Sequence, residues 1–333
     1  MSAPINIINR NNSFPFLTSA VLNDFDVISL SLGGVGVPYY LDAIDIKAFG
    51  ASDHGVFVSA STGNGGPGGL TVTNIAPWVT IVGVETIDRD FQDDVHLGNV
   101  NVVMNTLLLS TSLCLEWSLD LKTVIGKIVL CDRGINSRAV KCEVVKKASG
   151  VEMILANGVF DGEGLVADCH IFPAIAVGAS VGDEIRKYII TAEKSKSSAI
   201  ATIVFKSTHV NIRLAPVVAL FFTRGLNPES SKILKPDMFA PRFNILAAWH
   251  DKVGPSGIPS DKRRTEFNIL SRTSMACPHV SGLRALLKAA HPEWSPAMIR
   301  SVFFYNNRNE TTLDESIGNT STTLDFDAGH IHP

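Results

Sequence analysis

Short apolar runs that end in small residues, separated by helical segments, constrain the fold of this chain more than any other feature. The run DVISLSLGG, from Asp26 to Gly34, is apolar on both faces before it reaches a glycine pair, which is typical of a fully buried parallel strand. Val56 to Ala60 and Trp78 to Val84 predict two more buried strands, and Tyr39 to Ala51 carries apolar residues at helical spacing. The alternation of strand and helix predicts a βαβ crossover in a doubly wound α/β sheet.

The middle of the chain follows a different pattern. Short apolar segments succeed one another there with few helical patterns between them, apart from one helix predicted over 138–148. These segments are Lys127–Gly134, Met153–Gly158, Pro173–Gly178 and Ala201–Lys206. We therefore predict a separate, mainly β module over 105–206, which divides a larger domain into a first segment, 1–104, and a second segment, 207–333.

The last part of the chain returns to the first pattern. Residues Lys235 to Trp249 are typical of buried strands, and the segment from Thr273 to Ala290 predicts a long helix. The apolar residues of that helix fall at helical spacing, and they are Met275, Val280, Leu283, Leu286 and Leu287. Pro296 stands at the favoured first position of one more helix.

Composition and charge argue against two kinds of partner. Lys and Arg number 29 and Asp and Glu number 32, and they are interspersed, with a net charge of −3. This balance argues against a nucleic acid or a membrane surface as a partner. Apolar runs such as Val217 to Phe222 are far shorter than the roughly 18–20 residues that span a bilayer.

The first residues show no secretory signal pattern, so we expect either that the chain is not secreted or that it begins after its natural N-terminus.

We predict neither a metal site nor a cofactor. The 5 cysteines are an odd number and show no C-x-x-C spacing. The glycine-rich stretch from Gly65 to Gly69 lacks the spacing and the lysine of a phosphate-binding loop.

Three segments concentrate small residues where the backbone must approach another group closely: 29–34, 61–69 and 273–279. In the last of them, Ser274 opens a helix, where free N–H groups and the helix dipole favour developing negative charge. Asn64 follows a buried strand in a glycine loop and could donate to an oxyanion. Each segment also has a plainer interpretation, because glycines form turns, serine caps helices and asparagine favours turns.

Taken together, these segments carry a family resemblance. The sequence TSMACPHVSG, from Thr273 to Gly282, resembles the serine signature of the subtilisin-like serine peptidases. The pieces ISLSLGG, FVSASTGNGGPGG, APWVTIVG, ILKPD and NILAAW are similar to plant-type subtilases in the same order. The middle module resembles the protease-associated domain of those enzymes. The resemblance implies an incomplete subtilisin-like parallel sheet with that insert, endoproteolysis of polypeptides and an extracellular location.

The resemblance also implies a role for each matching residue. Ser274 matches the nucleophile, and Asn64 matches the side-chain donor of the oxyanion hole. The remaining matches form the two walls of the substrate cleft. One wall, which pairs with an extended peptide, matches Ser31, Leu32 and Gly33. The opposite wall matches Ser61, Thr62 and Gly63. His279 resembles the structural histidine of the serine motif, so it is not expected to act as the base.

Two motifs of the family are absent from the sequence. A serine needs an adjacent base, itself oriented by a carboxylate. In this family the Asp lies in a D-T/S-G motif and the His in an H-G-T-H motif, and the 333 residues contain neither. His54 is followed by glycine, but we predict that it is an exposed residue at a helix end. We therefore expect the chain alone to be nearly inert.

Further departures leave other interpretations open. Arg272 stands where the family has Gly and Arg284 where Ala is usual, so we expect Arg272 to strain its turn or fill the mouth of the pocket. Cys114 and Cys131 resemble the cysteine pair of the protease-associated domain, which would leave Cys142 free. The chain could also be a non-catalytic relative that binds peptides, or a gene fragment that forms no stable protein.

Overall fold

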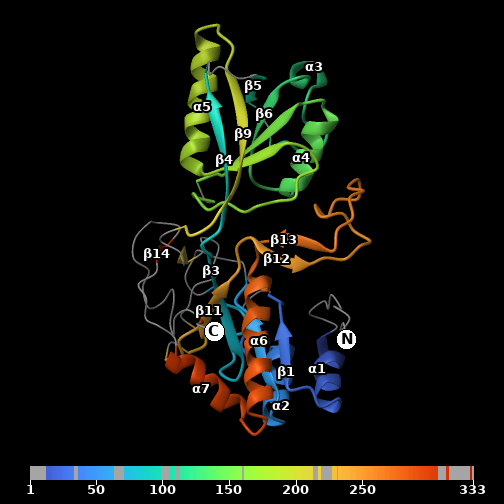
Figure 1. Ribbon diagram of the computed structural model, residues 1–333, viewed down its shortest axis with the longest axis vertical. Helices are drawn as coiled ribbons and strands as arrows, with labels where there is room; N and C mark the ends of the chain where they lie inside the picture. Colours follow the sequence, from blue (N-terminus) through green and yellow to red (C-terminus); the bar gives the residue numbers. More distant parts are fainter. Residues whose placement is uncertain are drawn as a thin grey trace. The chain divides into compact units, whose positions relative to one another are not determined.

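The computed structural model of this chain forms two compact units, which are described separately (Figure 1). The described residues are 13–33, 37–63, 71–98, 105–109, 113–159, 161–212, 217–218, 227–230, 232–306, 313–314 and 331. Unit 1 comprises residues 1–87, 214–243 and 272–333, and unit 2 comprises residues 88–213 and 244–271.

A parallel sheet forms the centre of unit 1. Its main strands are β1 (Val27–Leu30), β2 (Phe57–Ser61), β3 (Thr80–Glu85) and β11 (Met238–Pro241). They lie in the order β1, β2, β3, β11, and each neighbouring pair is parallel. The short strands β10 (Val217–Val218) and β14 (Leu313–Asp314) continue the sheet, and β10 is antiparallel to β3. The predicted crossover is confirmed, because helix α2 (Ala43–Asp53) joins β1 to β2. This helix begins later than expected because the Asp42 side chain accepts a hydrogen bond from Ile44 N at 2.9 Å and caps it.

The two faces of this sheet carry different side chains. Ile28 and Leu30 of β1 point into a core shared with α1 (Ser13–Leu22) and α2. Because strand residues alternate between faces, Ser29 points the other way, and its Oγ lies 3.4 Å from Cys277 Sγ on α6 (Thr273–Ala290). On β2, Ser59 Oγ lies 2.6 Å from Ser281 Oγ on the same helix. Helices therefore cover both faces, and α6 rests on small polar side chains.

A buried ion network joins β3 to β11. Asp237 accepts hydrogen bonds from Ile81 N and from Lys235 Nζ, each at 2.6 Å, and it also pairs with Arg300 of α7 (Pro296–Asn306). Lys235 Nζ donates in turn to Val79 O at 2.8 Å. The carboxylate and both cations therefore all have partners, which offsets the cost of burying their charges.

Unit 2 contains a mixed sheet of 6 strands. Their order is β4 (Asp90–Leu97), β9 (Ile200–His209), β5 (Asn105–Leu109), β6 (Ile128–Asp132), β7 (Glu152–Ala156) and β8 (Ala174–Val177). Strands β5 to β8 are parallel, and β9 is antiparallel to both β4 and β5. The helices are α3 (Leu121–Val124), α4 (Arg138–Lys147) and α5 (Ala179–Lys194).

The expectation of few helices in this region is wrong because of α5, which has 16 residues. Its buried residues Ile185, Ile189 and Ala192 stand at helical spacing, so the signal was present in the sequence. Unit 2 also holds a hairpin of β12 (Ile245–Ala248) and β13 (Phe267–Leu270). The boundaries of the predicted insert, 105–206, therefore stay a prediction.

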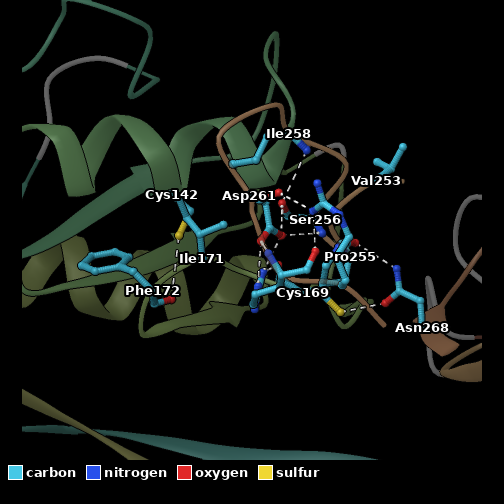
Figure 2. A network of polar contacts seen from close by, with 12 residues as sticks. Cys142, Cys169, Ile171, Phe172, Val253, Pro255, Ser256, Ile258, Asp261 and Asn268 are labelled. Carbon is cyan, nitrogen blue, oxygen red and sulfur yellow. Dashed lines mark hydrogen bonds and ion pairs between the residues drawn. The ribbon is translucent and has the colours of Figure 1, made fainter. Parts of the chain in front are cut away.

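The loop between β12 and β13 is organised by one carboxylate (Figure 2). Asp261 accepts hydrogen bonds from Ser256 N at 3.1 Å and Oγ at 2.7 Å, and Arg263 Nη2 donates to it at 2.8 Å. The bonds from Arg263 hold the pKa of Asp261 well below its usual range, and those from Ser256 add to the effect. Asn268 donates from Nδ2 to Pro255 O at 2.9 Å, and Cys169 Sγ donates to Asn268 Oδ1 at 2.8 Å. The loop is thus fixed to the rest of unit 2.

The cysteines behave as the resemblance implies. Cys114 and Cys131 form a disulfide, and both are buried in the core beside α4. Cys142 of α4 is free and buried in the same cluster, and Cys169 and Cys277 are also free. Burial raises the pKa of the Cys142 thiol.

Candidate active site

Ser274 occupies the first turn of α6. The helix begins at Thr273, and the preceding residue, Arg272, caps it without a side-chain hydrogen bond. First-turn N–H groups of a helix have no partner within the helix, so this position favours negative charge. The expectation that Arg272 strains its turn is wrong, because its φ of −156° is an extended conformation that any residue adopts.

One wall of the site extends from the end of β1. Ser31 Oγ donates a hydrogen bond to the backbone oxygen of Ser274 at 3.1 Å, which ties this wall to the start of α6. Leu32 packs against the core of unit 1. Gly33 approaches the opposite wall so closely that a Cβ there would lie 3.3 Å from Gly63 Cα. A side chain at Gly33 would therefore push the walls apart.

The opposite wall continues from β2. Ser61 is the last residue of that strand, and Thr62 is fully buried. Thr62 O accepts hydrogen bonds from Thr73 N and Oγ1, each at 3.1 Å. Gly63 has a φ of +100°, a conformation that other residues rarely adopt. The two predicted walls thus lie together, and Ser274 is bonded to one of them.

Asn74 is a residue of this site that sequence reasoning missed. Its side-chain amide donates to Leu32 O at 2.8 Å and to Ser61 O at 2.9 Å, so it joins the two walls. In the structure Asn74 has a left-handed backbone, with a φ of +60°, a conformation that Asn tolerates better than most residues. The residue type is therefore the one local feature of the sequence that fits this position. Nothing in the sequence indicates its partners, because they lie far from it along the chain.

The oxyanion donor predicted at Asn64 lies outside the described residues, so its role stays a prediction. In the described part of the chain, no histidine or carboxylate side chain is hydrogen-bonded to Ser274. His279 places Nδ1 2.7 Å from Met275 O in its own helix, and His54 ends α2 with Nδ1 2.8 Å from Gly50 O. The predictions that these histidines are not the base agree with this geometry.

Cys277 lies beneath the first turn of α6 and is fully buried. Besides Ser29, it contacts Leu30 O at 3.8 Å and Ser59 Oγ at 3.7 Å. Burial raises the pKa of its thiol, which disfavours the reactive thiolate. It therefore acts as a small packing residue, as expected.

No metal or membrane feature was found among the described ranges. No group of three or more His, Cys, Asp or Glu side chains there is arranged to hold a metal ion. In the same ranges, no helix has the length and apolar character to cross a bilayer.

The parallel sheet with helices on both faces defines an α/β protein, and Ser274 opens the helix that packs on β1 and β2. A profile of the Peptidase_S8 family, the subtilases, matches residues 15–320. The chain belongs to the subtilase family.

Two curated relatives are plant proteins from Arabidopsis thaliana. Subtilisin-like protease SBT1.5 is 60% identical over 347 residues, which cover 95% of this chain and 45% of the relative. Subtilisin-like protease SBT1.6 is 51% identical and covers 94% of this chain and 44% of the relative. The chain thus spans less than half the length of these relatives. Among solved structures, the psychrophilic subtilisin-like protease Apa1 from Pseudoalteromonas sp. AS-11 covers 95% of this chain and 70% of its own, at 15% identity and a TM-score of 0.36.

Proposed function

We propose that this chain provides the nucleophile and the peptide-binding walls of a serine endopeptidase, with Ser274 as the nucleophile. The observation that supports the proposal is the hydrogen bond from Ser31 to the backbone of Ser274, because Ser274 then lies beside a strand end that could pair with an extended peptide. The substrate is a polypeptide, and the family resemblance favours an extracellular one.

The proposed reaction passes through an acyl-enzyme. Ser274 Oγ forms a bond with the scissile carbon, its proton passes to a base, and the carbonyl oxygen takes the negative charge. Asn64 and backbone N–H groups at the start of α6 stabilise that oxyanion. When the C–N bond breaks, the base returns the proton to the leaving amine, and water then hydrolyses the ester.

The base and its orienting carboxylate come, in this proposal, from polypeptide outside the 333 residues, because the sequence contains neither motif of the family that carries them. A second candidate function is non-catalytic peptide binding by the same walls. The absence of both motifs favours it.

An alkyl fluorophosphonate probe, which reacts with nucleophilic serines, separates the two functions. We expect slow labelling of the folded chain, mapped by mass spectrometry to the peptide that contains Ser274. Ser274→Ala should abolish the labelling, whereas Ser301→Ala, on the exposed surface of α7, should leave it unchanged. Folded protein that binds peptide but is not labelled would favour the non-catalytic function.

A further inference from the structure

The two walls of the peptide cleft are no longer paired with each other beyond the ends of strands β1 and β2. The parallel pairing of β1 with β2 runs from Val27 opposite Phe57 to Leu30 opposite Ala60. Leu32 and Ser61, whose carbonyl groups Asn74 holds, lie beyond the last of these pairs. The Asn74 amide therefore connects the walls at the point where the strand ladder no longer does.

The donor capacity of the Asn74 side-chain nitrogen is fully used by this connection. An amide nitrogen has two N–H groups, and here each meets one backbone carbonyl. Because both acceptors are carbonyl oxygens, they also determine which end of the side chain is the nitrogen. Asn74 is 4% exposed, so these bonds do not compete with water. The side-chain amide therefore has no N–H left to donate to a substrate, and its two bonds act on the walls.

The spacing that Asn74 fixes leaves little tolerance. At the neighbouring position, a Cβ added to Gly33 would lie 3.3 Å from Gly63 Cα, closer than an ordinary contact. Thr73, the residue before Asn74, holds Thr62 O through both its amide and its hydroxyl. Residues 73 and 74 thus bind three backbone oxygens of the cleft, two on the wall that follows β2 and one on the wall that follows β1.

We propose that Asn74 is a positioning residue that sets the width of the peptide cleft and so determines how well an extended substrate binds. This inference rests on the proposed function, because it concerns the same walls. The residue acts chiefly on long substrates that contact both walls.

Two probes of different length test this role. An alkyl fluorophosphonate reports on Ser274 alone, whereas a phosphonate carrying four alanine residues must also occupy the cleft. Asn74→Asp keeps the size of the side chain but sets a carboxylate against two carbonyl oxygens. Asn74→Gly keeps the left-handed backbone and removes the amide. Both variants should lower the ratio of peptidyl to alkyl labelling rates about tenfold or more, because buried carbonyls lose their partner.

Asn157 provides a matched control in unit 2. It is also 4% exposed, and its amide likewise bridges two backbone oxygens, those of Gly162 and Gly164, each at 3.0 Å. Asn157→Asp should therefore lower stability without changing the labelling ratio. An equal loss for both probes in the Asn74 variants, or no loss for either, would overturn the proposed role.

The proposed function and the role of Asn74 can fail separately. If neither probe labels the wild-type chain, Ser274 is not a nucleophile in this chain. The role of Asn74 is then measured by fluorescence anisotropy with a fluorescein-labelled alanine hexapeptide. Asn74→Asp should weaken its binding about tenfold or more relative to Asn157→Asp. Equal binding by both variants, or no binding by the folded wild-type chain, would rule the role out.

Discussion

Arg284 is buried in α6 in a way that arginine rarely tolerates. The side chain is 0% exposed, and its guanidinium lies 3.5 Å from the ring centroid of Phe57 and 4.5 Å from that of Phe303. None of its guanidinium nitrogens has a hydrogen-bond partner among the described residues. Burial lowers its pKa to about 8, and the charge of Arg300 adds to this shift. The two rings offset only part of the cost of removing this cation from water.

We predict that Arg284→Leu raises the free energy of unfolding by about 1–3 kcal/mol at pH 7, because an unpaired buried charge is replaced by an apolar side chain. The folded pKa lies below the ordinary value of 12.5, so the unfolded chain binds more protons than the folded chain between these values. The destabilisation caused by burying the charged Arg284 is therefore at its maximum below about pH 8, and it decreases as the pH rises.

Urea unfolding at pH 7 and pH 10 measures this effect. The advantage of Arg284→Leu over the wild type should shrink at the higher pH. Arg284→Lys, which keeps a cation at the same position, should show no comparable gain. A variant less stable than the wild type at both pH values would contradict the prediction.

Some residues of the candidate site can be found from short sequence motifs, and others depend on contacts that are distant along the chain. Ser31, Ser61 and Ser274 each lie in a short motif, so the sequence alone indicated them as candidates. Asn74 depends on contacts 42 and 13 positions away, and no local pattern encodes such a pair. The sequence also named Arg272 as a source of strain, which fails because the residue type does not reveal the backbone conformation.

At the scale of elements, periodicity predicted α6 better than any other helix. Its predicted bounds, Thr273 to Ala290, are those of the structure. The helix α1 was not predicted, because its sequence SFPFLTSAVL has no acidic first turn, no basic last turn and little separation of apolar and polar faces. Strands β2 and β3 were predictable because both of their faces are buried and apolar or small, as in other parallel sheets. The prediction that β1 is fully buried is wrong, because Ser29 is exposed.

Two glycines in different elements give opposite predictions for the same substitution. Gly282 lies inside α6 with no atom within 4 Å of an added Cβ, so Gly282→Ala should stabilise the fold by about 0.5–1 kcal/mol. Gly83 lies in β3, where a Cβ would stand 2.7 Å from the ring of Phe239, so Gly83→Ala should destabilise it by about 1–3 kcal/mol. Denaturant unfolding of both variants checks the pair, and the same sign for both would contradict this account.

At the scale of the whole molecule, the only disulfide among the described cysteines belongs to unit 2. It links residues separated by 17 positions, and a cross-link of that size stabilises by about 3 kcal/mol through the entropy of the unfolded chain. We predict that a double substitution, Cys114→Ser with Cys131→Ser, lowers the free energy of unfolding of unit 2 by about 3 kcal/mol.

Hydrogen exchange followed by mass spectrometry measures this effect in each unit. Peptides from β5 to β8 should lose protection in the double variant, whereas peptides from β1 to β3 should keep theirs. Cys169→Ser, which removes a free thiol in the same unit, serves as the control. Equal loss of protection in both units would show that they do not unfold independently.

The contact between α6 and the sheet of unit 1 has a consequence for the position of Ser274. Ser29, Ser59, Cys277 and Ser281 meet there, and hydroxyl and thiol groups take the place of branched apolar side chains. Small side chains bring the helix backbone close to the strands, and hydrogen bonds between them resist sliding of the helix along its axis. These contacts and the hydrogen bond from Ser31 to the backbone oxygen of Ser274 together hold the start of α6 at the end of β1, so a larger side chain at any of the four positions should move Ser274 away from that strand end.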